Sequence, residues 1–154
     1  SMHDFEKSVE SGRKATQLNP NDPRVISVYG ESLLRLKEYD EGLYYLEKAY
    51  ELDPIPQGQT TSDRRVSALF LGNYLKNNFD RCQELNQKIV DIDLRTWLLN
   101  THLFDKNDKD YGEESWFQKG LRNFSDSNWD MEVDRFHLND DELKSNLISL
   151  AKSI

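Results

Sequence analysis

Two segments of this chain repeat one another at a spacing of 34 residues, and this spacing constrains the fold more than any other feature of the sequence. An aromatic residue, an alanine and a proline occur in both segments: Phe5, Ala15 and Pro20 correspond to Tyr39, Ala49 and Pro54. A period of this length is typical of a unit made of two helices and a turn. The spacing therefore predicts an all-α chain built from antiparallel helix pairs.

The clearest unit covers residues 23–54. Asp22 can cap a helix and Pro23 suits its first turn, after which apolar residues recur at helical spacing. Residues 37–40 form the turn, and a second helix ends before Pro54, which cannot continue it. Gly42 lies in this second helix, where we expect it to lower stability by ~1 kcal/mol relative to alanine.

Other segments follow the same plan with weaker signals. Residues 3–20 match only the second helix of a unit, residues 62–94 form a degenerate unit, and residues 95–122 form a weak helix pair. Residues 123–154 hold an irregular stretch and then a capping helix that Asn139 begins. We expect one domain over residues 1–154. Because the chain starts within a repeat, we also expect it to be the C-terminal part of a larger protein.

Residues 23–54 resemble the tetratricopeptide repeat family, with Gly30, Tyr39, Ala49 and Pro54 at family positions. Ile26 stands where the family usually has tryptophan, and Gly42 replaces its small alanine. The resemblance implies helix pairs stacked as a right-handed solenoid, closed here by a C-terminal capping helix. It also implies a non-catalytic module that binds a protein or peptide through its concave face.

The end of the chain is similar to the C-terminal tetratricopeptide regions of bacterial signalling proteins, including adenylate cyclases and winged-helix regulators. The similarity covers Phe136 to Asp140 and the helix from Leu143 to Ala151. It implies part of a larger signalling or regulatory protein. The alternative hypothesis is a structural or dimerisation segment of such a cyclase or transcriptional regulator, with no separate ligand. Self-association as a homodimer stays open.

The first helices of the two better repeats carry the candidate partner-binding residues. The first repeat contributes Arg24, Ser27, Glu31 and Arg35, and the second contributes Arg64, Ser67 and Tyr74. Arginine and tyrosine in a groove suit an acidic or extended peptide, whereas the alternative interpretation is a solvated helix face. Arg24, Arg64 and Arg65 are also candidates for a local basic patch.

The sequence offers little for catalysis, and we predict no enzyme, cofactor or metal site. His3, His102 and His137 are widely spaced, and residues 105–112 look like a calcium loop but place lysine and tyrosine at ligand positions. The single cysteine, Cys82, is expected in the core, as are Trp97 and Trp116. Trp129 is either a plug over the last helix pair or an exposed contact.

Charge and hydropathy restrict the partners further. The formal net charge of −8 argues against nucleic-acid binding by this segment. No apolar run approaches the ~20 residues that cross a bilayer, so we expect no membrane insertion. We expect a cytoplasmic protein, with the periplasm as the alternative if the parent is a membrane-anchored regulator.

Overall fold

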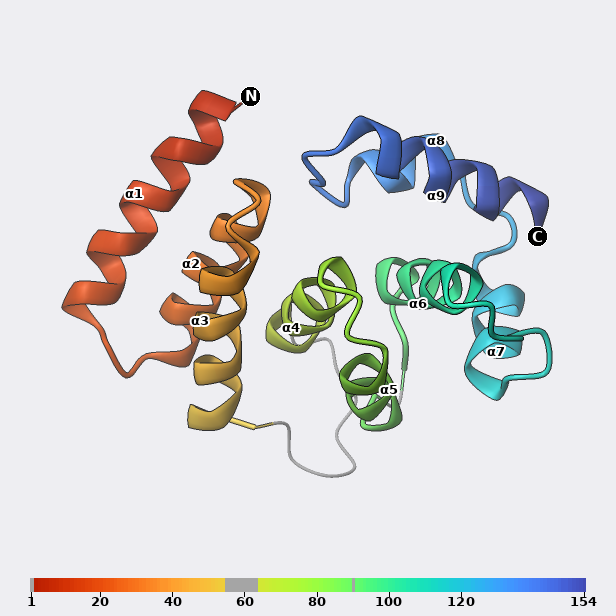
Figure 1. The fold of residues 1–154 in the computed structure, drawn as a ribbon, viewed down its shortest axis with the longest axis horizontal. Coiled ribbons are helices and arrows are strands. Elements are labelled where there is room, and N and C mark those ends of the chain that lie inside the picture. The colour runs from red at the N-terminus through yellow and green to blue at the C-terminus, as the bar shows by residue number, and fades with distance from the viewer. Residues whose placement is uncertain (1, 55–63, 90) are drawn as a thin grey trace. The chain divides into compact units, whose positions relative to one another are not determined.

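The computed structural model describes residues 2–54, 64–89 and 91–154, apart from the side chain of Arg64. Over these residues the chain is all-helical, as predicted. It divides into two compact units, residues 1–90 and residues 91–154 (Figure 1). The start of the unit predicted over residues 62–94 lies outside the described residues.

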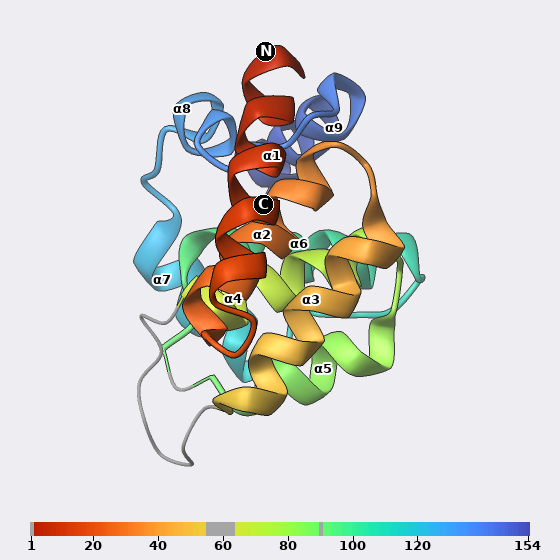
Figure 2. The same cartoon turned by 90° about the vertical axis from the view of Figure 1, so that its left-hand side faces the viewer.

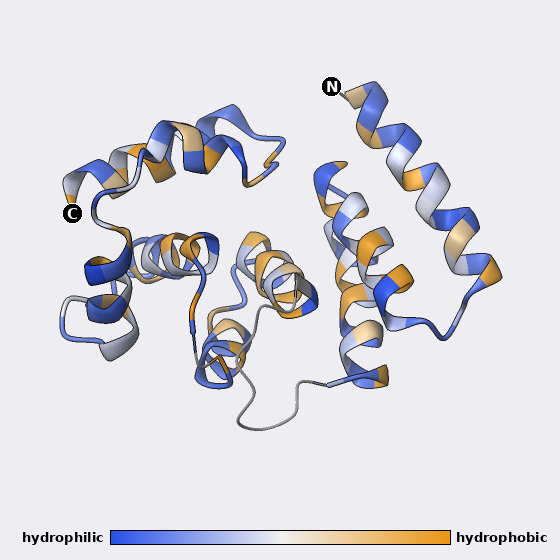
Figure 3. Cartoon of the chain, turned by 180° about the vertical axis from the view of Figure 1, so that it is seen from behind, coloured by the Kyte–Doolittle hydropathy of each residue, from blue (hydrophilic) through white to orange (hydrophobic). Residues whose placement is uncertain are grey.

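Unit 1 holds α1 to α5: α1 (Met2–Leu18), α2 (Pro23–Arg35), α3 (Tyr39–Leu52), α4 (Arg64–Leu75) and α5 (Phe79–Gln87). Helix α2 is its centre, since it packs against α1, α3 and α4. Figure 2 shows α1 in red and α3 in yellow-orange in the same unit. Both apolar and polar positions occur around these helices (Figure 3), as expected where one face is buried.

The start of α2 follows the predicted cap. An Asp22 carboxylate oxygen accepts a hydrogen bond from the backbone N–H of Arg24 at 3.0 Å, and Pro23 begins the helix. Both features satisfy or remove backbone donors that a first turn leaves without helical partners.

Glycines set the closest approach between α2 and α3. A Cβ placed on Gly30 would lie 2.9 Å from the carbonyl oxygen of Gly42, and a Cβ on Gly42 would lie 2.9 Å from that of Gly30. Gly30 also meets Leu46, and Gly42 meets Leu34, so the two helices run antiparallel. Gly42 therefore has a packing role that the sequence did not indicate, because its missing Cβ makes room for the α2 backbone.

Helices α2, α4 and α6 (Leu94–Lys106) end in the same turn. The residue at its centre has a positive φ in each case: 64° at Lys37, 55° at Asn77 and 54° at Asp108. The next N–H bonds to a carbonyl five residues earlier: Glu38 to Leu33 at 3.0 Å, Asn78 to Asn73 at 2.9 Å and Lys109 to Phe104 at 3.0 Å. These are Schellman C-caps formed without glycine.

The repeated turn provides a common register for these three helices. Eleven residues before the positive-φ residue lie Ile26, Val66 and Trp97, which are 0%, 1% and 1% exposed. One buried position therefore recurs in α2, α4 and α6. In α6 this position is occupied by a tryptophan, Trp97.

Unit 2 holds α6, α7 (Ser115–Phe124), α8 (Trp129–Asp134) and α9 (Asp141–Ser153). Trp97 is at its core and its indole N–H donates to the carbonyl of Phe117 at 3.1 Å. Its ring stacks on Phe117 at 5.5 Å and on Trp129 at 5.9 Å. Gly120 allows this packing, since an added Cβ would lie 2.1 Å from Trp97 Cδ1.

Several sequence-based details differ from the structure. The second repeat was expected to reach residue 94, but α5 ends at Gln87, and Asp93 caps α6 by accepting from Thr96 N–H at 2.7 Å. Residues 129–134 form α8 within the stretch expected to be irregular. Asp140, not Asn139, caps α9, accepting from Leu143 N–H at 3.0 Å.

Candidate partner-binding surface

The structure divides the predicted surface residues by exposure. The side chain of Arg24 is 84% exposed. Ser27 and Glu31 are buried, at 4% and 6%, and so is Tyr74 at 1%. Burial removes these three from any open surface of this structure. The physical reason on α2 is its central position, since packing by three helices leaves little of it to solvent.

The other predicted residues lie between these extremes. Arg35 is partly buried, and its guanidinium lies 3.9 Å from the Glu31 carboxylate one helical turn away. Ser67 is also partly buried, while the side chain of Arg64 lies outside the described residues. Of the predicted face, Arg24 is thus the described residue that solvent reaches most fully.

Arg24 lies in an open pocket of about 620 Å³ in unit 1. The pocket forms where α1 and α3 end and α2 and α4 begin. Its described lining residues are Asn19, Pro20, Asn21, Asp22, Pro23, Arg24, Asp53 and Arg65. The apolar side chain of Leu18, directly before this lining, is 82% exposed.

The lining of this pocket contains two arginines, and each lies beside an aspartate. Arg65 Nη1 donates to Asp53 Oδ2 at 2.7 Å, and Arg24 Nε lies 3.8 Å from Asp22 Oδ1. Arg24 and Arg65 both line this pocket. The described part of the patch is not purely basic, however, because two aspartates lie beside the two guanidinium groups.

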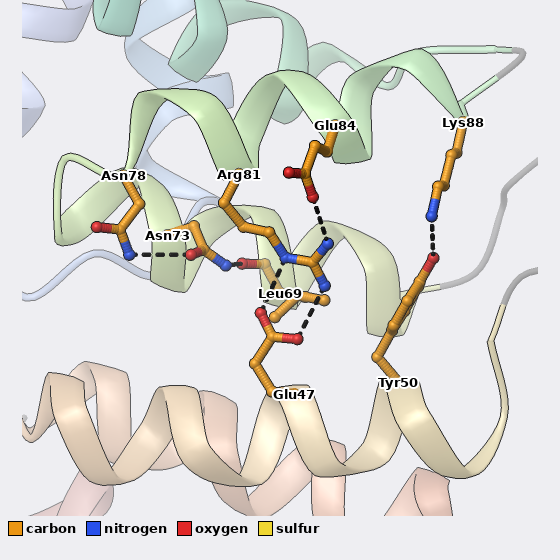
Figure 4. Close-up of polar contacts among 8 residues, drawn as sticks. All are labelled: Glu47, Tyr50, Leu69, Asn73, Asn78, Arg81, Glu84 and Lys88. Atoms are coloured by element: carbon orange, nitrogen blue, oxygen red, sulfur yellow. Dashed lines mark hydrogen bonds and ion pairs between the residues drawn. The ribbon is translucent and has the colours of Figure 1, made fainter.

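The second helices of the repeats carry a polar cluster that the sequence did not predict (Figure 4). Arg81 of α5 donates to both carboxylate oxygens of Glu47 in α3, at 3.0 and 2.8 Å, and to Glu84 at 2.9 Å. Lys88 Nζ donates to Tyr50 Oη at 3.2 Å. Hydrogen bonding to Glu47 raises the pKa of Arg81. The geometry is that of a bidentate link between two helices.

A buried amide network supports the turn between α4 and α5. Asn73 is 3% exposed, and its amide donates to the carbonyl of Leu69 at 3.0 Å. Its side-chain oxygen accepts from Asn78 at 3.0 Å (Figure 4). The amide thus fixes the same turn that Asn77 closes with its positive φ.

The residues that could act as a nucleophile, a general base or metal ligands do not form a common site in the described part of the chain. Cys82 is fully buried, as predicted, with its thiol 3.9 Å from the carbonyl of Phe70. Burial lowers the pKa of His102, and the Lys106 charge acts in the same direction. Among the described residues, no three His, Cys, Asp or Glu side chains gather where they could hold a metal ion.

The three tryptophans differ in how far their side chains are buried. Trp97 is core, as predicted, and Trp129 is 7% exposed, which supports the plug over the exposed contact. Trp116 is partly exposed and lies against Phe104, with ring centroids 5.2 Å apart.

Comparison with known proteins adds no relative from which a site can be transferred. No protein-family model matches the sequence, and no curated protein matches it. Within the described part of the chain, no helix combines the length and apolar character needed to cross a bilayer.

Proposed function

We propose that this chain is a non-catalytic protein-interaction module of the tetratricopeptide type, belonging to a larger signalling or regulatory protein. Three features support the proposal: the 34-residue sequence period, the shared C-cap of α2, α4 and α6, and the buried position shared by Ile26, Val66 and Trp97. Such repeats bury their cores against neighbours and expose extended surfaces to partners.

The binding site in this proposal is the open pocket around Arg24. Its exposed guanidinium, on the first turn of α2, is the observation that carries the proposal. The partner is an extended peptide that places an acidic side chain on Arg24, since arginine forms its strongest hydrogen bonds with carboxylates. Exposed Leu18, next along the chain, offers apolar contact beside it.

A peptide selection on the intact chain tests this site. Peptides enriched from a random display library would be synthesised, and their affinities measured for the wild type, Arg24→Glu and Arg122→Glu. Arg122 is an exposed arginine of α7 and provides a matched charge reversal in the other unit. We expect Arg24→Glu to weaken binding at least tenfold and Arg122→Glu to change it less than twofold.

Two results would count against the proposal. If Arg24→Glu and wild type bound the peptides with equal affinity, the pocket would not be the binding site. If the enriched peptides had no acidic residues, the proposed contact between a carboxylate and Arg24 would be wrong. Circular dichroism of each variant checks that loss of binding does not reflect loss of helix.

A further inference from the structure

Helix α9 packs against the rest of unit 2 with few fully buried side chains. It has thirteen residues, all described, of which only Leu147 and Ala151 are buried. Helix α6 has the same length, and eight of its residues are buried. Leu143, Ile148 and Leu150 are partly buried on the same side, so α9 is attached along one helical face that has only two fully buried side chains.

The surface beneath α9 is formed by α6 and α8, the two helices of unit 2 against which it packs most closely. We call it the α6–α8 surface. Helix α8 contacts both α6 and α9, since Trp129 stacks on Trp97 of α6 and α8 packs against α9. Figure 1 shows α9 alongside α8.

Two ion pairs join α9 to α8. Lys152 Nζ lies 2.7 Å from Asp130 Oδ2, and Lys144 Nζ lies 3.4 Å from Asp134 Oδ1. The aspartates are 66% and 80% exposed, so solvent reaches both pairs, although the side chain of Lys144 is only 25% exposed. Ion pairs of this kind add specificity and contribute little to stability.

From these contacts we infer that α9 is a displaceable internal ligand, and that the α6–α8 surface accepts from a partner an amphipathic helix with two basic residues that face α8. The recognised pattern is that of α9: Lys144, Leu147, Ala151 and Lys152. A partner helix with two apolar residues four positions apart and two basic residues eight apart meets the same aspartates. This surface is distinct from the Arg24 pocket and does not depend on it.

Segments held by few buried contacts open locally at lower free energy than the core. Hydrogen exchange of the full wild-type chain measures this opening. We expect the amides of α9 to exchange at least 100-fold faster than those of α6. Exchange of both helices at one rate would overturn the inference, because α9 would then open only with the rest of unit 2.

Charge variants test the contacts with α8. In Lys144→Glu/Lys152→Glu we expect α9 to exchange at least tenfold faster while α6 is unchanged. Adding Asp130→Lys and Asp134→Lys restores the pairs with reversed sign, so protection should return. If the combined variant is no more protected than the double variant, the ion pairs do not guide docking and the recognised pattern is wrong.

A synthetic peptide of residues 139–154 serves as the partner helix. Because Lys144→Glu/Lys152→Glu weakens the internal competitor, we expect the labelled peptide to bind this full-length variant at least tenfold more tightly than it binds wild type. The same peptide with Leu147→Glu is the control and should not bind. The inference would be overturned if the peptide bound neither the variant protein nor the wild-type protein. It would also be overturned if the wild-type peptide and the Leu147→Glu peptide bound equally well.

Discussion

Lys37, Asn77 and Asp108 adopt a left-handed backbone conformation at the ends of α2, α4 and α6. This conformation costs a residue with a Cβ about 1–2 kcal/mol, whereas glycine adopts it freely. At Asn77 and Asp108 a short polar side chain reduces this cost, but Lys37 has no such compensation. Lys37 therefore carries removable strain.

We predict that Lys37→Gly stabilises unit 1 by about 0.5–1 kcal/mol, because the relieved strain exceeds the added freedom of the unfolded chain. Urea unfolding followed by far-ultraviolet circular dichroism measures the shift in midpoint. Lys48→Gly, within α3, is the opposite control and should cost about 1 kcal/mol. Destabilisation by both substitutions would contradict the role assigned to the turn.

Gly42 supports a second prediction at the residue scale. Alanine would gain about 1 kcal/mol of helix propensity, but its Cβ would lie 2.9 Å from the backbone oxygen of Gly30. Overpacking against backbone costs about 1–3 kcal/mol, so we expect Gly42→Ala to be destabilising by up to about 2 kcal/mol. Gly112→Ala is the control, since nothing lies within 4 Å of its added Cβ. A stabilised Gly42→Ala would mean that α2 and α3 separate easily.

At the scale of helices, the link between Glu47 and Arg81 joins α3 to α5. A double-mutant cycle with Glu47→Gln and Arg81→Met isolates its coupling energy. We expect about 1 kcal/mol, because the bidentate geometry is favourable but both side chains are partly exposed. The coupling should fall as salt rises from 0.05 to 0.5 M. A coupling energy of zero at low salt would mean that the ion pair between Glu47 and Arg81 does not contribute to stability.

Local signals predicted most helices of this chain, and long-range packing decided the rest. Asp22 and Pro23 predict the start of α2, because a capping residue and a first-turn proline affect only the backbone of the next few residues. Asn139 and Asp140 are both good caps, and local preference does not separate them. The exposure of the candidate surface residues was predicted less well. Glu31 is polar and lies at a helix position expected to face solvent, yet it is buried because α1, α3 and α4 pack around α2. The Arg24 pocket depends on how four helix ends meet.

At the scale of the whole molecule, stability should depend on pH through His102. Burial lowers its pKa below the ordinary value of 6.5, so the unfolded chain binds a proton more readily than the folded one. The stabilisation is complete above pH 6.5 and is lost as the pH falls from there toward the folded-state pKa.

We therefore predict that the unfolding free energy detected by tryptophan fluorescence falls between pH 7.5 and pH 5.5. His102→Gln should remove most of this decrease, while His3→Gln, at an exposed position of α1, should retain it. An equal slope in wild type and His102→Gln would assign the pH dependence to other groups.

The stacked indoles of Trp97 and Trp129, with planes 22° apart and centroids 5.9 Å apart, have an optical consequence. Transition dipoles this close couple, so the pair should produce an exciton couplet in the far-ultraviolet circular dichroism. All three tryptophans of the chain belong to residues 91–154. The couplet is thus an intrinsic, label-free signal for the packing of α8 on α6.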